Sequence, residues 1–178
     1  MINMNKIEIK QLTISDLDQL QKIGRQTFFE TFNSSNTEEN MRKYLDEEFS
    51  THKLSRELND KNAVFYFAML DKKAIGYLKI NFGKSQTEFQ DDSAVEIERI
   101  YVLSEFHGKK IGQILFEKSA EIALHKKADY VWLGVWEHNY RAINFYKKNG
   151  FEEFDKHIFK LGDEEQTDIL MKLKFKNN

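Results

Sequence analysis

Two short stretches of the sequence combine residue types that bind ligands or transfer protons. The first reads Ile97-Glu98-Arg99-Ile100-Tyr101-Val102, then His107-Gly108-Lys109-Lys110-Ile111-Gly112-Gln113, followed by a long amphipathic segment. This order is typical of a strand, a turn and the start of a helix. Unpaired backbone N–H groups at such a turn, together with the helix dipole, attract an anion such as a pyrophosphate, and the two lysines add positive charge. An ordinary strand-to-helix turn is the alternative interpretation.

The second stretch contains Asn139, Ala142 and Tyr146, which are spaced by three and four residues. On a helix this spacing places an amide, a small side chain and a phenol on one face. The small residue leaves room for a ligand against the helix. The alternatives are a helix N-cap for Asn139 and a core aromatic for Tyr146.

Several other chemistries are excluded by what the sequence lacks. There is no cysteine, which rules out disulfides, thiolate metal sites, a cysteine nucleophile and an acyl-cysteine intermediate. The P-loop, the dinucleotide fingerprint and the Gly-x-Ser-x-Gly motif are absent. The five histidines show no metal-ligand spacing, so no metal site is expected.

The elements that position these residues are predicted from hydrophobic periodicity. Strands are expected at Lys6–Thr13, Asn62–Leu70, Ala74–Phe82, Ala94–Leu103, Tyr130–Trp136, Glu152–Lys160 and Gln166–Lys174. A first helix is expected after Ser15, which can cap it with Asp18 three residues on, and its apolar positions are Leu17, Leu20, Gly24 and Phe28. Further helices are expected at Thr37–Leu45, Thr51–Leu58, Gly108–Lys127 and Asn139–Lys148. The two strand–helix–strand units in the second half predict a mixed sheet covered by helices on both faces.

The composition bounds the class of protein. The 178 residues fit one domain, 1–178. The net charge of −2 (27 basic and 29 acidic residues) argues against nucleic-acid binding through bulk charge. The longest apolar run, Ala63 to Leu70, is too short to span a membrane. The first residues lack the apolar core of a signal peptide, so a cytoplasmic protein is expected.

The two stretches together resemble motifs A and B of the GNAT superfamily of acetyl-CoA-dependent N-acetyltransferases. The family's motif A turn reads Gln/Arg-x-x-Gly-x-Gly/Ala, and the corresponding positions here are His107, Lys110 and Gly112. Motif B reads Asn-x-x-Ala-x-x-Phe-Tyr-x-x-x-Gly-Phe, and every position is matched, by Asn139, Ala142, Phe145, Tyr146, Gly150 and Phe151. The resemblance implies an α/β (α+β) fold with a mixed, mostly antiparallel, twisted sheet of about seven strands and helices on both faces.

Further segments are similar to the PaiA-type spermidine/spermine acetyltransferases of bacilli, so the resemblance covers nearly the whole chain. These segments are Gln26-Thr27-Phe28, Asn40-Met41, Tyr44-Leu45, 96–101, 132–137 and 162–168. Two departures concern the turn, where Lys110 replaces the first family glycine and His107 replaces Gln/Arg. If the turn needs a positive φ at position 110, lysine costs about 1–2 kcal/mol there. Its charge then offsets the cost at the pyrophosphate, or Gly108 supplies the flexibility instead.

The resemblance also implies roles for named residues. Ile100, Tyr101 and Val102 would present backbone groups to the pantetheine arm and the acetyl carbonyl, with one N–H acting as an oxyanion donor. The turn from His107 to Gln113 would hold the pyrophosphate. Asn139 would hydrogen-bond the pantetheine chain. No acyl-cysteine relay is available, so direct transfer in a ternary complex is expected.

The chemistry requires a base, because an alkylamine with a pKa of about 10.4 is neutral only about 0.04% of the time at pH 7. Glu98 is assigned this role, since a glutamate occupies the matching position in other polyamine acetyltransferases of the superfamily. A surface carboxylate is the alternative, and Glu96 is the reserve candidate. Tyr146 corresponds to the family's acid, and would protonate or hydrogen-bond the leaving thiolate.

The predicted substrate is a polyamine such as spermidine or spermine, whose charges call for an acidic groove. Candidates for its lining are Glu38, Glu39, Asp46, Glu47, Glu48, Asp91 and Asp92, with ordinary solvated faces as the alternative. Two other functions stay open: acetylation of a protein or peptide amine, and a non-catalytic acetyl-CoA-binding regulatory module. The expected partners are acetyl-CoA and a small cationic amine, with no nucleic acid and no membrane, in a monomer or homodimer.

Overall fold

A computed structural model of the chain describes residues 6–161 and 164–175. Its seven strands form one open sheet in the order β1-β2-β3-β4-β5-β7-β6. Every neighbouring pair is antiparallel except β4 and β5, which are parallel. The strands are β1 (Ile7–Gln11), β2 (Ala63–Leu70), β3 (Lys73–Phe82), β4 (Ala94–Val102), β5 (Tyr130–Trp136), β6 (Glu152–Leu161) and β7 (Glu164–Lys174). The predicted fold class and all seven predicted strands are confirmed. Gly162 and Asp163, which the resemblance included, lie outside the described residues.

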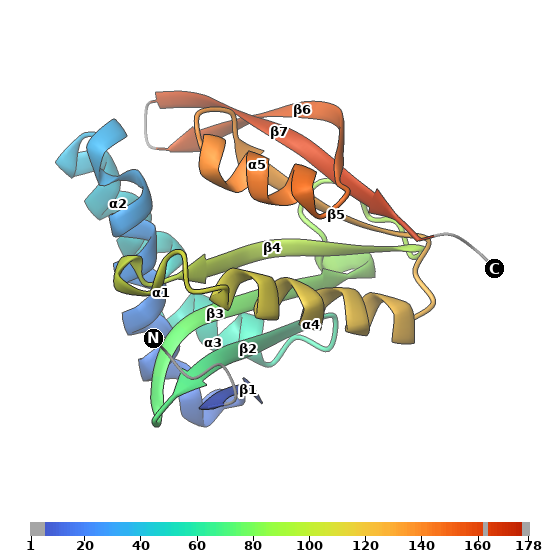
Figure 1. Cartoon of the computed structure of the whole chain (residues 1–178). Helices are drawn as coiled ribbons and strands as arrows, with labels where there is room; N and C mark the ends of the chain where they lie inside the picture. The colour runs from blue at the N-terminus through green and yellow to red at the C-terminus, as the bar shows by residue number, and fades with distance from the viewer. Residues whose placement is uncertain (1–5, 162–163, 176–178) are drawn as a thin grey trace.

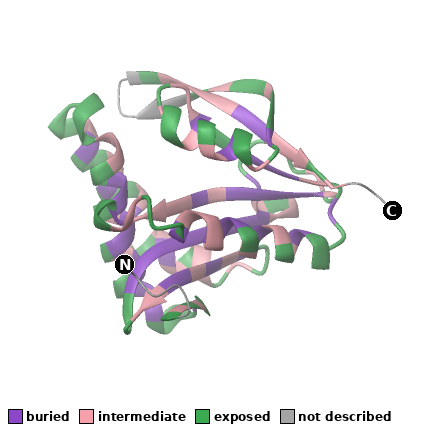
Figure 2. Ribbon diagram, viewed as in Figure 1, coloured by how far each residue is buried: buried purple, intermediate pink, exposed green. Residues whose placement is uncertain are grey.

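Helices cover both faces of the sheet, as Figure 1 shows. One group is α1 (Leu17–Phe32), α2 (Glu38–Glu48) and α3 (Thr51–Leu58), whose apolar side chains share a core with β2 and β3. The other is α4 (Ile111–His125) and α5 (Tyr140–Lys148), which pack in a second core against β3, β4 and β5. Buried residues concentrate on the strands, and the outer sides of α2, α4 and α5 are exposed (Figure 2).

Two helix starts differ from the sequence prediction. The first helical segment is capped by Thr13 and Asp16 around a short 3-10 turn rather than by Ser15 and Asp18, because the Asp16 carboxylate accepts from the Thr13 N–H. The α4 helix begins at Ile111 rather than Gly108. Its N-cap, Lys110, has φ +60° and Gly108 has φ +74°, so both positions lie in the left-handed region and cannot continue a helix backward.

The site is positioned by a divergence between the two parallel strands. Pairing between β4 and β5 covers only Ala94–Glu96 and Tyr130–Trp132. Beyond Glu96 the edge of β4 that faces β5 is therefore unpaired as far as the end of the strand. Parallel strands that separate in the middle of a sheet leave a wedge-shaped opening that a chain-like ligand can enter.

A β-bulge in β4 adds to this effect. Lys79 of β3 pairs with Arg99 and Ile80 pairs with Ile97, so Glu98 has no pairing partner across β3. The extra residue breaks the strict alternation of side chains. As a result both Glu98 and Arg99 contact charged groups on the α3 side of the sheet.

Candidate active site

A cleft of about 920 Å³ runs across the divergence of β4 and β5. Its lining comes from α1–α3 and the loop after α3, from the strands β2 to β7, from α5, and from the loop after β3. Ile97 to Tyr101 of β4 and the facing Gly134 to Trp136 of β5 form its middle. The cleft therefore contains the unpaired edge of β4, where backbone groups are available to a ligand.

The predicted backbone contacts fall on this edge with one exception. Ile100 and Tyr101 line the cleft. The Val102 carbonyl, by contrast, accepts a hydrogen bond from His107 Nε2 at 2.7 Å. That carbonyl is thus occupied within the protein, and the free backbone groups are those nearer the centre of β4.

The turn before α4 has the geometry of an anion site. The first N–H groups of a helix have no intrahelical partner, and here they belong to Ile111 and Gly112. The Ile111 side chain is buried, so its contribution is limited to the backbone. A Cβ on Gly112 would meet no atom within 4 Å, which leaves this side of the helix start open. The residues present therefore fit a pyrophosphate.

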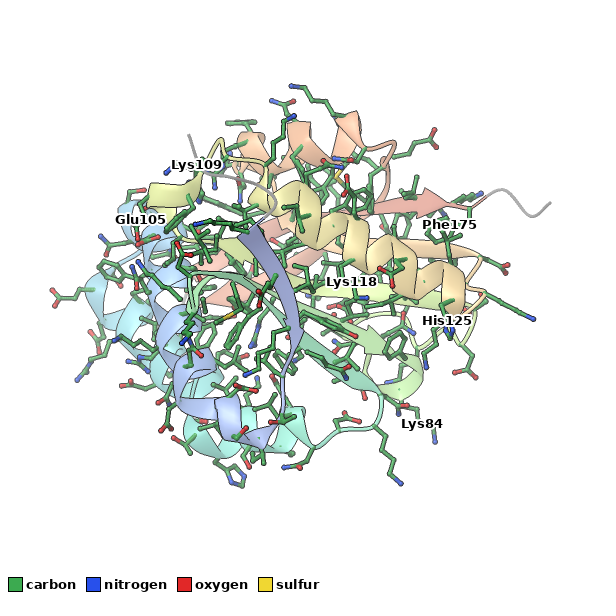
Figure 3. The ribbon with its side chains drawn as sticks, turned by 60° about the horizontal axis from the view of Figure 1, so that its bottom comes forward. Lys84, Glu105, Lys109, Lys118, His125 and Phe175 are labelled. Atoms are coloured by element: carbon green, nitrogen blue, oxygen red, sulfur yellow. The ribbon has the colours of Figure 1, made fainter. Side chains whose placement is uncertain are left out.

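The two lysines of the turn differ in what they contact. Lys109 donates to the Glu105 carbonyl at 2.6 Å and lies over the Phe106 ring, so its charge is directed back along the turn. Figure 3 shows Lys109 and Glu105 together, at the end of the molecule away from Lys84. Lys110 is exposed at the N-cap itself. At the far end of the turn, Gln113 donates to Asn149 at 3.0 Å and so ties α4 to the end of α5.

His107 connects the end of β4 to α5. Its Nε2–H donates to the Val102 carbonyl, which leaves Nδ1 as the acceptor for the Arg141 guanidinium. Burial lowers the pKa of His107, and the Arg141 charge lowers it further. The imidazole is therefore neutral, and it holds an arginine beside the turn.

The α5 helix places its motif residues in the cleft as the spacing predicts. Asn139, Ala142 and Tyr146 all line it. The Asn139 Oδ1 caps α5 by accepting from the Ala142 N–H at 3.2 Å. Among the described residues its amide nitrogen makes no hydrogen bond, so capping and ligand binding are compatible. Tyr146 is buried against Phe145 and Phe151, and burial raises the pKa of its phenol well above 10.

Glu98 lies in a buried network of ion pairs. Lys79 Nζ is 2.6 Å from Glu98 and 2.9 Å from Glu57 of α3. Arg99 is 3.4 Å from Glu98 and 3.2 Å from Glu48 of α2. Burial alone would raise the pKa of Glu98, but the charges of Arg99 and Lys79 outweigh it and lower the pKa to about 2. Such a carboxylate holds cations in place and accepts a proton poorly.

Glu96 has a different environment two residues earlier. Its side chain is buried and accepts from Asn81 Nδ2 at 3.0 Å, from the Thr87 N–H at 2.9 Å and from the Thr87 hydroxyl. Burial raises the pKa of Glu96 to about 7, helped by the charge of Glu98 and opposed by the Thr87 and Asn81 hydrogen bonds. Among the described residues no Lys or Arg forms an ion pair with it. A carboxylate that titrates near neutrality is suited to general base catalysis.

Another part of the cleft combines aromatic rings with carboxylates. Phe28 stacks on Tyr44 with ring centroids 4.3 Å apart, and the ring centroids of Phe32 and Trp136 are 5.8 Å apart. Asp168 of β7 also lines the cleft, and within the described chain it makes no hydrogen bond or ion pair. Burial raises its pKa to about 6, with a lowering from His157 and a smaller raise from Glu88.

Comparison with known proteins identifies the family. The acetyltransferase (GNAT) family matches residues 20–151. The chain belongs to the GNAT acetyltransferase family. It is 39% identical over 169 residues to an uncharacterized N-acetyltransferase of Lactobacillus delbrueckii subsp. lactis, covering 95% of this chain and 98% of the relative.

Two further comparisons concern a single organism. The chain is 27% identical over 175 residues to the spermidine N(1)-acetyltransferase of Thermoplasma acidophilum, covering 96% of this chain and 99% of the relative. It also resembles the crystal structure of the PaiA N-acetyltransferase of that organism in complex with coenzyme A, with a TM-score of 0.80, 26% identity and coverage of 95% and 99%. These likenesses accord with the predicted family and subfamily resemblance.

In this acetyltransferase the acidic residues at the cleft are mostly not those predicted. Of the seven candidates only Glu48 lines it, and Glu48 is paired with Lys53 and Arg99. The others lie outside the cleft. Most of the acidic residues of α2 face solvent, and Asp91 binds Ser93 of its own loop and Tyr130 of β5. The carboxylates that do line it, besides Glu48, are Glu57, Asp60, Glu88, Glu96, Glu98 and Asp168.

Three further candidate residues were not identified from the sequence. Arg141 reaches the turn only because α5 packs beside it, although its place two residues after Asn139 in motif B was a usable signal. Asp168 and Thr87 enter the cleft from β7 and from the loop after β3. No local pattern marks either of them.

None of the helices described in residues 6–161 and 164–175 has the length and apolarity needed to cross a membrane.

Proposed function

We propose that this acetyltransferase moves the acetyl group of acetyl-CoA to a primary amine of a polyamine such as spermidine or spermine. The observation that carries the proposal is the combination of an aromatic wall with Asp168, a cleft carboxylate that makes no hydrogen bond or ion pair among the described residues. A polyamine alternates ammonium groups with methylene chains. Aromatic faces cover methylenes and attract cations, and a carboxylate partly removed from water binds an ammonium strongly.

The likeness to the Thermoplasma spermidine N(1)-acetyltransferase supports the same substrate class. The cleft also holds the charges that would exclude other amines. Glu88 lies near the Asp168 carboxylate and forms an ion pair with His157 at 3.2 Å. Together they make this end of the cleft acidic, which favours a substrate with a second positive charge over a simple monoamine.

Acetyl-CoA would bind along the divergence of β4 and β5. The backbone of Ile100 and Tyr101 would hold the acetyl end, with one N–H polarising the thioester carbonyl. Asn139 would donate its amide N–H to the pantetheine chain. The helix start at Ile111 and Gly112 would hold the pyrophosphate, with Lys110 and Arg141 supplying positive charge beside it.

We assign the proton transfers to Glu96 and Tyr146. The amine nitrogen attacks the thioester carbonyl, a C–N bond forms and the C–S bond breaks. Glu96 takes the proton that the amine loses, because its pKa of about 7 suits a base at neutral pH. The predicted base, Glu98, is held by Lys79 and Arg99, so we propose that it positions those cations instead.

Tyr146 would stabilise the leaving sulfur. Its phenol stays protonated across the physiological range because burial raises its pKa. A thiol has a pKa of about 8.5, so full proton transfer from this phenol to the thiolate is uphill. The hydroxyl therefore acts as a hydrogen-bond donor to the thiolate, which takes its final proton from water as coenzyme A leaves.

The substrate is tested by comparing kcat/KM for spermidine, butylamine and a peptide with a free α-amine. We expect spermidine to be preferred, and Asp168→Asn to raise KM for spermidine about 10-fold while leaving butylamine nearly unchanged. Asp92→Asn is the matched control, because Asp92 is exposed and does not line the cleft. A wild-type enzyme that acetylates butylamine as efficiently as spermidine contradicts the polyamine assignment, and a preference for the peptide supports a protein amine instead.

A further inference from the structure

We infer that Thr87 is a positioning residue for the reaction, because its backbone N–H and its hydroxyl grip the two oxygens of the Glu96 carboxylate. The N–H donates to Oε2 at 2.9 Å and the hydroxyl donates to Oε1. This inference rests on the proposed role of Glu96 as the base. It assigns the loop between β3 and β4 a function in proton transfer, beyond that of a simple connection.

The loop is held firmly enough to set the orientation of a side chain. Gln86, directly before Thr87, is buried and accepts from the Trp132 indole N–H at 2.7 Å. Its amide nitrogen donates to the Asp91 carbonyl at 2.8 Å, which closes the loop on itself. Phe89 packs on Trp132 with ring centroids 5.4 Å apart. Thr87 is therefore fixed between two loop residues, Gln86 and Phe89, that both contact Trp132 of β5.

The two Thr87 bonds also determine which protonation state of Glu96 the cleft favours. Both are donors, so both stabilise the ionised carboxylate, and the Asn81 amide adds a third donor on the other side. Burial and the negative charge of Glu98 act in the opposite direction. Removing the Thr87 hydroxyl takes away one of the donors that lower the pKa of Glu96, so burial and the charge of Glu98 raise this pKa further. A larger fraction of Glu96 would then be protonated and inactive at neutral pH.

The charged groups around Glu96 belong to several elements. Glu98 lies on its own strand, and Lys79 of β3 and Glu57 of α3 form the adjoining ion pairs. Glu88 follows Thr87 in the loop. The facing residue of β5, Trp132, carries no charge. Because all of these groups are unchanged in a Thr87 variant, a shift in titration reports the loss of the hydroxyl itself.

The test compares Thr87→Val with Thr87→Ser. Valine keeps the shape and the backbone N–H but removes the hydroxyl, whereas serine keeps the hydroxyl. The measurement is kcat as a function of pH at saturating spermidine. We expect the acid limb of the Thr87→Val pH–rate profile to move up by about one pH unit. Activity at pH 7 then falls about 5-fold, because the ionised fraction of Glu96 drops from about one half to about one tenth, and it recovers at high pH. Thr87→Ser should follow the wild type. Ser93→Ala is the control for losing another hydroxyl of the same loop, since Ser93 binds Asp91 and does not line the cleft.

A second measurement separates this inference from the proposed function. The carboxyl carbon of Glu96 is titrated by ¹³C NMR in the wild type and in Thr87→Val, which reports the effect of Thr87 without turnover. An unchanged Glu96 titration, or a Thr87→Val profile lowered equally at every pH, overturns the positioning role. A shifted titration together with full activity of Glu96→Gln contradicts the role of Glu96 as base and, with it, the catalytic meaning of Thr87.

Discussion

The two sides of the divergence between β4 and β5 differ in the groups that they offer to a ligand. On the α4 side, the groups that would hold coenzyme A are mainly backbone N–H groups at one strand edge and one helix start. On the α1–α3 side, the amine would meet side-chain charges that come from β3, β4, β7, α2, α3 and a loop. Backbone sites tolerate side-chain changes, whereas charged networks depend on each member because removing one leaves its partner unpaired.

This difference predicts where single substitutions have large effects. On the amine side, Glu96 and Glu98 are only two residues apart on one strand, yet they lie in opposite electrostatic environments. Their amide variants are therefore the sharpest comparison that the chain offers. Neither substitution changes the volume of the side chain appreciably.

The largest effect is expected for Glu96→Gln. If Glu96 takes the amine proton, kcat at neutral pH should fall by about 100-fold or more. Raising the pH should restore part of the rate, because more of the amine is then neutral by itself. Glu98→Gln should lower kcat much less. If steady-state kinetics instead show a larger loss of kcat for Glu98→Gln than for Glu96→Gln, Glu98 is the base.

Tyr146→Phe tests the α5 side of the site. The variant removes the hydroxyl and keeps the ring that packs on Phe145 and Phe151. We expect kcat to fall about 10- to 1000-fold, with a small change in KM for acetyl-CoA. Tyr130→Phe is a suitable control, since the Tyr130 hydroxyl binds Asp91 away from the reacting groups. An undiminished kcat at saturating substrates would show that Tyr146 only packs.

The same glutamates should change stability in opposite directions. The pKa of Glu98 is lowered to about 2, so its contribution is present above about pH 4.5 and is lost as the pH falls toward 2. Glu98→Gln should therefore destabilise the protein at neutral pH, by about 1–3 kcal/mol. The deficit should shrink in acid.

For Glu96 the sign is reversed. Its pKa is raised to about 7, so ionisation penalises the folded state increasingly between about pH 4.5 and 7. Glu96→Gln should lack this penalty, and its stability relative to the wild type should rise over that range. Urea denaturation at several pH values measures both variants. Parallel pH dependence in the two would contradict the assigned environments.

These contrasts also explain what the sequence could predict. The turn from His107 to Gln113 and the helix face of Asn139, Ala142 and Tyr146 are each contiguous, so spacing along the chain reports their geometry. The ion pairs of Lys79 join residues 19 to 22 positions apart through tertiary packing. Glu96 and Glu98 were both named as candidate bases, but no pattern in the sequence reveals which one a buried cation neutralises.

A similar limit applies to the acidic groove. The acidic residues of α2 were conspicuous as a cluster, and most of them face solvent. Asp168 was embedded in an alternating strand and gave no sign of facing a cleft. A cluster in the sequence reports local charge, whereas the cleft depends on which strands and helices meet. The turn illustrates the converse, since its two positive φ values follow from one short motif.

The turn itself is tested by reversing its charges. Lys110→Glu should raise KM for acetyl-CoA about 10-fold with a smaller change in kcat, as expected for a contact made before the chemical step. Lys109→Glu should have a weaker effect, because Lys109 is directed toward Glu105 and Phe106. Lys22→Glu controls for net charge from an exposed position on α1. Equal KM values in all three variants would contradict pyrophosphate binding at this turn.

The smallest effect concerns the strain that lysine introduces at the turn. Lys110 has φ +60° at the start of α4 and Lys127 has φ +57° just after its end. A left-handed conformation costs a non-glycine residue about 1–2 kcal/mol, and glycine returns part of that gain through its freer unfolded state. Lys110→Gly and Lys127→Gly should each stabilise the protein by up to about 1 kcal/mol in urea denaturation. Only Lys110→Gly should also raise KM for acetyl-CoA, because only that lysine lies at the proposed pyrophosphate site. If both glycine variants stabilise the fold equally and neither changes KM, Lys110 contributes no charge to the ligand, and the helix start and Arg141 must bind it without that lysine.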